Sequence, residues 1–162
     1  MRKKNGFTLI ELIVTVAVIM ILAGVGAMSL NNFNGVKELE STREEVGGFI
    51  KLAKNLAVTR QLSTGTSNLK YVRVSISGNI LTITGIDNVG NQDTSPPYSS
   101  VSINTKNGII INAPSFGFMA STGRLTDLNG TLVGTTMTID VSRGTDKKTI
   151  IINDLGTIKN AN

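Results

Sequence analysis

Glu11 is the residue of the N-terminal segment whose chemistry needs an explanation, because it stands alone in an apolar run. The residues from Leu12 to Leu30 carry no charge, and Arg2, Lys3 and Lys4 precede the run. A charged side chain at the centre of a bilayer costs roughly 2.5–3.5 kcal/mol on insertion scales. A buried charge is tolerated when it is paired and strongly penalised when it is not. The segment therefore predicts a cationic partner for Glu11; a glutamate that snorkels from a helix end is the alternative.

Enzyme chemistry has little support elsewhere in the chain. The sequence contains no histidine and no cysteine, which excludes thiolate zinc sites, Cys–His catalytic pairs and disulfides. A carboxylate pair could support glycoside hydrolysis, but aspartates in turn-like contexts commonly bond their own backbone. The aspartates in question are Asp87, Asp93, Asp127, Asp140, Asp146 and Asp154. Residues 87–93 offer oxygen ligands for calcium without the ligand pattern of an EF-hand. We therefore predict no catalytic residue, no metal and no cofactor.

The uncharged run and its basic flank predict a transmembrane helix over residues 7–30. A run of this length can span a bilayer, and the preceding basic residues should stay in the cytoplasm while the remainder crosses. The alternative of a secretory signal fits this segment poorly, because such a signal has a shorter apolar region followed by a small-residue cleavage site. A plain single-pass anchor is the simpler alternative, but it leaves Glu11 unexplained.

The residues "KKNG" followed by "FTLIEL" resemble the processing site of type IV pilins and of the pseudopilins of type II secretion. The resemblance implies that prepilin peptidase removes residues 1–6 by cutting after Gly6. It also implies N-methylation of the new terminal residue, Phe7, and retention of Glu11. The amine on Phe7 would then lie four residues before Glu11, on the same helix face. Either this amine or that of a neighbouring subunit could neutralise the carboxylate, so Glu11 would set the register of assembly.

The next segment, residues 31–62, has apolar residues at helical spacing. Its apolar positions are Val36, Leu39, Val46, Phe49, Ile50, Ala53, Leu56 and Ala57. No proline precedes Pro96, so one helix from Phe7 to about Leu62 is possible. Each glycine costs roughly 1 kcal/mol relative to alanine, and a break is expected near Asn31–Gly35.

Beyond Leu62 the pattern alternates with period two, which predicts strands separated by turns. The expected strands are 71–77, 79–85, 100–103, 108–112, 116–119, 136–142 and 148–154. Residues 87–100 have loop composition. Val72, Val74 and Ile76 should face a core while Tyr71, Arg73 and Ser75 face water. The predicted fold class is α+β: a long N-terminal helix, transmembrane then amphipathic, packed on an antiparallel β domain, sheet or sandwich, at 63–162.

The helix and β region are most similar to the H-type minor pseudopilins and FimT-like minor pilins. Major pilins commonly carry a C-terminal disulfide, which a chain without cysteine cannot form. The resemblance implies a structural, non-enzymatic subunit in the cytoplasmic (inner) membrane, N-terminus inside, that later enters a pilus or secretion pseudopilus. Its expected partners are prepilin peptidase, the membrane and other pilins.

DNA capture during natural transformation is the alternative function. Some FimT-like pilins are thought to bind DNA through arginines near the C-terminus. Here Arg143, Lys147 and Lys148 cluster around one turn, and the tail offers only Lys159. The net charge of +5 falls to 13 − 11 = +2 without the three basic residues of the leader, so bulk charge supports a nucleic-acid partner weakly.

Overall fold

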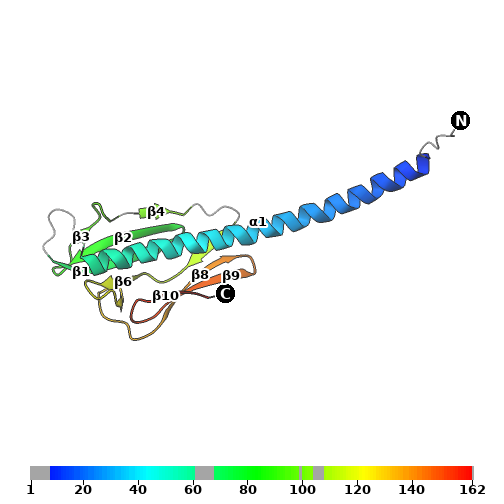
Figure 1. The fold of residues 1–162 in the computed structure, drawn as a ribbon. Coiled ribbons are helices and arrows are strands. Elements are labelled where there is room, and N and C mark those ends of the chain that lie inside the picture. Colours follow the sequence, from blue (N-terminus) through cyan, green and yellow to red (C-terminus); the bar gives the residue numbers. More distant parts are fainter. Residues whose placement is uncertain (1–7, 61–67, 99, 104–107, 162) are drawn as a thin grey trace. The chain divides into compact units, whose positions relative to one another are not determined.

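The computed structural model describes residues 8–60, 68–98, 100–103 and 108–161, and the backbone alone for residues 25–32. A single helix, α1, runs from Leu9 to Thr59 and is followed by ten strands in this part of the chain (Figure 1). The predicted break near Asn31–Gly35 is wrong, because α1 continues through it. A glycine weakens a helix by only about 1 kcal/mol, whereas proline, the residue that removes a helical hydrogen bond, is absent before Pro96.

Backbone contacts divide the chain into two compact units, Met1–Lys37 and Glu38–Asn162, and α1 contributes to both. In the second unit, one side of α1 is buried. The buried residues of this side are Leu39, Val46, Phe49, Ile50, Ala53, Leu56 and Ala57. They follow the spacing of three and four residues that a helix needs to present one face to a core. Val36, which we placed on this apolar side, is 49% exposed and belongs to the first unit.

The first sheet has six strands in the order β3-β2-β1-β6-β7, with β4 also paired to β2. Its strands are β1 (Leu69–Ser77), β2 (Ile80–Asp87), β3 (Gln92–Asp93), β4 (Ser100–Ser102), β6 (Phe116–Met119) and β7 (Leu125–Thr126). All of the pairings are antiparallel. The tight hairpin between β1 and β2 uses Gly78 with a φ of +58°, a conformation that glycine adopts without steric cost.

The second sheet has four strands in the order β10-β9-β8-β5, again antiparallel. Its strands are β5 (Ile109–Asn112), β8 (Met137–Arg143), β9 (Asp146–Ile152) and β10 (Ile158–Ala161). The sequence pattern predicts β5, β8 and β9 but not β10, whose residues it leaves in a C-terminal tail. The strands β3, β7 and β10 have two to four residues each, and they contain fewer apolar residues than β5 and β6, which are as short but were predicted.

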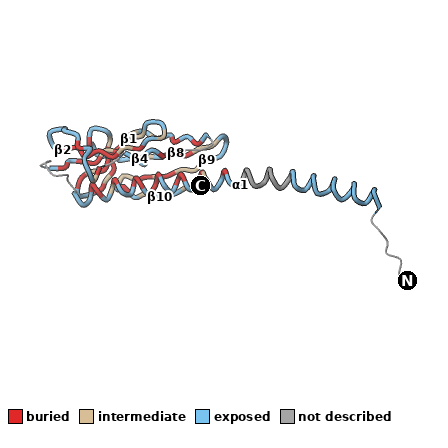
Figure 2. The backbone as a smooth tube through the Cα atoms, turned by 90° about the horizontal axis from the view of Figure 1, so that it is seen from above, coloured by how far each residue is buried: buried red, intermediate tan, exposed pale blue. Residues whose placement is uncertain are grey.

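The core of the second unit lies where α1 meets the inner faces of both sheets (Figure 2). Val72, Val74, Ile139 and Ile150 are fully buried. Ile150 comes within 3.9 Å of the position that a side chain at Gly47 of α1 would occupy. Helix and sheets therefore share one apolar core, which is the α+β arrangement that the sequence predicted.

Two loops cover the six-stranded sheet, that of Leu128–Gly130 over Tyr71 on the outer face and that of Tyr98 over Gly85 on the core face, and both correct the sequence prediction. Tyr71, expected to face water, is 3% exposed because its ring lies over Gly130 and its hydroxyl donates to Leu128 O at 2.6 Å. In the segment 87–100, expected to be an irregular loop, β3 forms and Tyr98 is 3% exposed. Tyr98 packs on Gly85 of β2, so a position without a side chain on one strand accepts an aromatic ring from the loop.

Candidate assembly site

The N-terminal turn of α1 is closed by a reciprocal pair of hydrogen bonds between Thr8 and Glu11. Thr8 N and Thr8 Oγ1 donate to Glu11 Oε2 at 3.3 and 3.2 Å, and Glu11 N donates to Thr8 Oγ1 at 3.3 Å. This is a capping box, in which the side chains of the N-cap and N3 residues satisfy each other's free N–H groups. The sequence signal was the T-x-x-E spacing at the start of an apolar run, which reasoning from the charge of Glu11 alone does not detect.

The capping box places the Glu11 carboxylate at the positive end of the helix dipole, where a negative charge is favoured. Leu12 N also donates to Thr8 O at 3.2 Å, so the first turn is fully formed. Thr15 Oγ1 bonds backward to the carbonyls of Glu11 and Leu12 at 3.0 and 2.9 Å. The polar side chains of this segment are thus held close to the backbone. Gly6 and Phe7, the predicted cleavage and methylation positions, lie outside the described residues.

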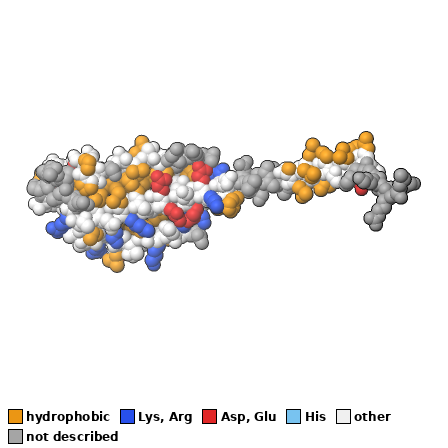
Figure 3. Space-filling view, turned by 45° about the horizontal axis from the view of Figure 1, so that its top comes forward, with side chains coloured by type: hydrophobic (Ala, Val, Ile, Leu, Met, Phe, Trp, Pro, Cys, Tyr) orange, Lys and Arg blue, Asp and Glu red, His pale blue; other side chains and the backbone are white. Residues whose placement is uncertain are grey.

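From Leu9 to Leu22, α1 carries exposed apolar side chains at nearly every position and therefore all round the helix; Figure 3 shows one side of this segment. The exposed members are Leu9, Ile10, Leu12, Ile13, Val14, Val16, Val18, Ile19, Met20, Ile21 and Leu22, between 43% and 76% exposed. A helix that is apolar all round is normally buried in a large core or a membrane. Among the residues that the structure describes, no helix combines the length and the hydropathy needed to cross a membrane.

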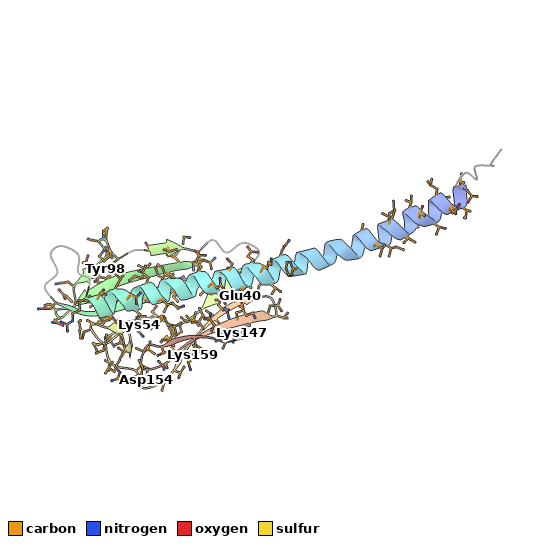
Figure 4. The ribbon with its side chains drawn as sticks, viewed as in Figure 1. Glu40, Lys54, Tyr98, Lys147, Asp154 and Lys159 are labelled. Carbon is orange, nitrogen blue, oxygen red and sulfur yellow. The ribbon has the colours of Figure 1, made fainter. Side chains whose placement is uncertain are left out.

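The four basic residues proposed for DNA binding are divided between the two faces of the four-stranded sheet. Lys148 lies opposite Val141, which is fully buried, and Arg143 lies two residues further along the same strand. Directly opposed residues share a face, so Arg143 and Lys148 are on the α1 side. Lys147 lies opposite Ser142, and Lys159 opposite Ile151, which places both on the outer face (Figure 4).

Lys147 is also partly neutralised on this outer face. Its Nζ lies 2.8 Å from Asp140 Oδ2, and Thr149 Oγ1 donates to Asp140 Oδ1 at 2.9 Å. The hydrogen bond from Lys147, with that from Thr149, holds the pKa of Asp140 below its usual value although burial acts in the opposite direction. The carboxylate is therefore charged at neutral pH, and only Lys159 of the outer pair has no acidic partner among the described contacts.

Asp87 lies at the start of the oxygen-rich loop considered for calcium, and its carboxylate accepts hydrogen bonds from the residues that follow it in this loop. Its Oδ1 accepts the N–H groups of Val89 and Asn91 at 2.9 and 2.8 Å, and Asn91 Nδ2 donates to Oδ2 at 2.9 Å. Burial raises the pKa of Asp87, but the bonds from Asn91, Val89 and Gly90 outweigh it and leave the pKa lowered. Within the described ranges, no three Asp or Glu side chains gather closely enough to hold a metal ion.

Comparison with known proteins connects the N-terminal segment and the fold to filament proteins. Residues 1–27 match the model of the prokaryotic N-terminal methylation motif. The crystal structure of the type IV minor pilin FimU from Pseudomonas aeruginosa (strain PAO1) is similar, with a TM-score of 0.54. The alignment has 15% sequence identity and covers 76% of this chain and 92% of that chain, so the likeness shows a shared fold. A search of curated proteins by sequence found no match.

Proposed function

We propose that this chain, a type IV pilin-like protein with an N-terminal methylation motif, is a structural minor subunit of a type IV filament. In this proposal, prepilin peptidase cuts after Gly6 and Phe7 is N-methylated. The subunit is held in the cytoplasmic membrane until it enters a pilus or a secretion pseudopilus. The β domain, outside the membrane, then contacts other subunits or cargo.

The observation that carries the proposal is the apolar surface of α1 between Leu9 and Leu22. Eleven large apolar side chains there are at least 43% exposed. Burying apolar surface contributes roughly 25 cal/mol per Å², so this part of the helix would be stabilised by a membrane or by packed helices of other subunits. The membrane stage rests on the sequence, in which the uncharged run extends from Leu12 to Leu30.

The capping box supports a defined role for Glu11 in assembly. Its carboxylate is bound to Thr8 at the helix N-terminus, and Thr8 directly follows in sequence the residue whose amine cleavage after Gly6 would create. A charge transferred into a packed bundle is tolerated only with a partner. Glu11 could therefore accept the amine of its own or a neighbouring subunit while Thr8 keeps the helix end closed, and a subunit docked in another register would leave the carboxylate unpaired.

The test is the N-terminal mass of the protein recovered from sheared surface filaments or from an overproduced pseudopilus. The proposal expects a chain that begins at N-methylated Phe7 and co-purifies with other pilins. An intact Met1 terminus in protein that remains entirely in the membrane fraction would contradict it and would favour a plain anchor.

DNA capture remains the second candidate, tied to Lys147 and Lys159 on the outer face of the four-stranded sheet. The division of the basic residues between two faces and the ion pair of Lys147 with Asp140 reduce the positive surface available to DNA. The structural role therefore has the stronger support.

A further inference from the structure

One asparagine of the β domain combines the sequence of a glycosyl acceptor with an exposed position. Asn129-Gly130-Thr131 follows the N-x-Ser/Thr acceptor pattern, and it is the only place in the sequence that does. Asn34 and Asn107 also precede glycine, but neither has a hydroxyl residue two positions later. Asn129 and Thr131, whose side chains define the acceptor, are both exposed.

The backbone of the turn that carries Asn129 is held by hydrogen bonds to side chains outside the acceptor triplet. Asp127 Oδ1 accepts the N–H groups of Asn129 and Thr131 at 2.9 and 2.8 Å. From β1, Tyr71 Oη and Arg73 Nη2 donate to Leu128 O at 2.6 and 3.1 Å. The backbone of the turn is thus fixed by Asp127, Tyr71 and Arg73, none of which belongs to the acceptor triplet.

Gly130 is required by the turn for two reasons. Its φ is +78°, a left-handed conformation that residues with a side chain rarely adopt. A Cβ at this position would also lie 2.7 Å from Tyr71 Cε1. The middle residue of the triplet is therefore set by the fold, whereas neither requirement bears on the identities of Asn129 and Thr131.

The same turn protects Asn129 against deamidation, the competing chemistry of an Asn-Gly pair. Deamidation begins when the nitrogen of the following residue attacks the asparagine carboxamide. Gly130 N is hydrogen-bonded to Asp127 O at 3.2 Å, so the attack would have to break this contact. This hydrogen bond opposes loss of the carboxamide, and Asn129 itself is exposed to solvent.

We propose that Asn129 is an N-glycosylation site, with an oligosaccharide carried on a polyprenyl diphosphate as the donor. A bond forms between the Asn129 amide nitrogen and the anomeric carbon of the sugar, and the bond from that carbon to the diphosphate oxygen breaks. The amide gives up one proton to a base of the transferase, the lipid diphosphate leaves, and no redox change occurs. The location of this step outside the cytoplasm rests on the proposed function.

The attached glycan would cover apolar surface that the turn leaves open. Leu128 and Leu132, which flank the acceptor triplet, are 44% and 43% exposed. Exposed apolar patches promote association. A glycan at Asn129 would therefore keep this corner of the domain hydrated and would direct filament contacts to other faces.

The test uses the purified full-length chain in detergent, a bacterial oligosaccharyltransferase and a synthetic polyprenyl diphosphate-linked oligosaccharide, so that export is not needed. We expect intact mass to rise by one glycan and peptide mass spectrometry to place it on Asn129. Asn129→Gln and Thr131→Ala should abolish the gain, whereas Thr131→Ser should keep it. Asn34 and Asn107 should stay unmodified and serve as internal controls.

A second arm separates this inference from the proposed function. The chain is isolated from a host that has the transferase, and the N-terminus and Asn129 are both measured. A chain that is cleaved after Gly6 but unmodified at Asn129 overturns the glycosylation site alone, as does an unmodified chain in the purified reaction when a control acceptor peptide is converted. Modification of Asn129 in the purified reaction on a chain that its host leaves uncleaved supports the site and contradicts the proposed function.

Discussion

Thr8 and Glu11 each donate a backbone N–H to the other's side chain, both at 3.3 Å, and so close the N-terminus of α1, where the following turns are apolar. A charged residue that stands isolated in the sequence therefore has a structural partner three positions away. This pair separates two roles of Glu11, capping the helix and carrying a charge, that can be tested independently.

Glu11→Gln should keep the capping box, because glutamine can also serve at N3, but it removes the charge. We expect Glu11→Gln and Glu11→Ala to be cleaved normally and to fail in filament incorporation, measured in the sheared fraction. Thr8→Val, in contrast, removes the cap and should cost about 1 kcal/mol of helix stability, with Thr8→Ser as the matched control. Normal incorporation of Glu11→Gln would show that the charge has no role in register.

Gly6→Ala should prevent removal of the leader, because the resemblance places the cut after this glycine. The variant should migrate as an unprocessed band on a gel and retain Met1 by mass spectrometry. Asn5→Ala, one position earlier in the leader, is the control and should be processed. Removal of the leader from the Gly6→Ala chain would place the cut elsewhere.

Gly85→Ala should destabilise the β domain, because the added Cβ would lie 2.6 Å from Cε2 and 2.7 Å from Oη of Tyr98. Overpacking of this kind costs roughly 1–3 kcal/mol, measured by denaturant unfolding. Gly134→Ala is the control, since no atom lies within 4 Å of its added Cβ and a surface change is usually within about 0.5 kcal/mol. Removal of the ring with Tyr98→Ala should make the Gly85→Ala step much less costly, and an equal cost in both backgrounds would contradict the packing of Tyr98 on Gly85.

The Tyr98 hydroxyl should titrate far into the alkaline range. Burial, aided by the negative charge of Asp93, raises the pKa of Tyr98 to about 12, whereas an unperturbed tyrosine titrates near pH 10. Because the folded-state pKa is raised, the contribution of this group to stability is complete below about pH 10 and is lost as the pH rises toward 12. Phenolate absorbance and the free energy of unfolding across this window, with Tyr98→Phe as control, measure the effect; titration of Tyr98 near pH 10 would refute it.

DNA binding, if it occurs on the outer face of the four-stranded sheet, should depend on Lys147 and not on Lys148. We expect the pair of substitutions Lys147→Ala and Lys148→Ala to weaken a mobility shift at low salt, with the weakening reproduced by Lys147→Ala alone. Removing a lysine that binds a phosphate should reduce the salt slope by about 1. Asp140→Asn, which frees Lys147 from its 2.8 Å ion pair, should strengthen binding. An unchanged shift for the double variant would end the DNA hypothesis.

The local features of the chain could be predicted because they depend on neighbours in sequence. The amphipathic side of α1 from Leu39 to Ala57 and the strands β1, β2, β8 and β9 follow from periods of 3.6 and 2. The charged and capping residues at the start of α1 are likewise set by a spacing of three or four residues. The short strands β3, β7 and β10 could not be recognised, although each pairs with the strand that precedes it in the chain, because so few residues with so few apolar members carry no period.

The sequence by itself determined the N-terminal methylation motif, the lone carboxylate of the apolar run and the α+β class. Only the tertiary structure decided which faces these residues occupy. Lys147 and Lys148 are neighbours in sequence, yet the strand pleat places them on opposite sides of a sheet whose register is set by β8. Tyr71 and Tyr98 looked like surface residues, yet glycines at 130 and 85, distant in sequence, leave the space that buries them. The physical reason is that sheet register and loop packing join residues by distance in space, which a local pattern does not contain.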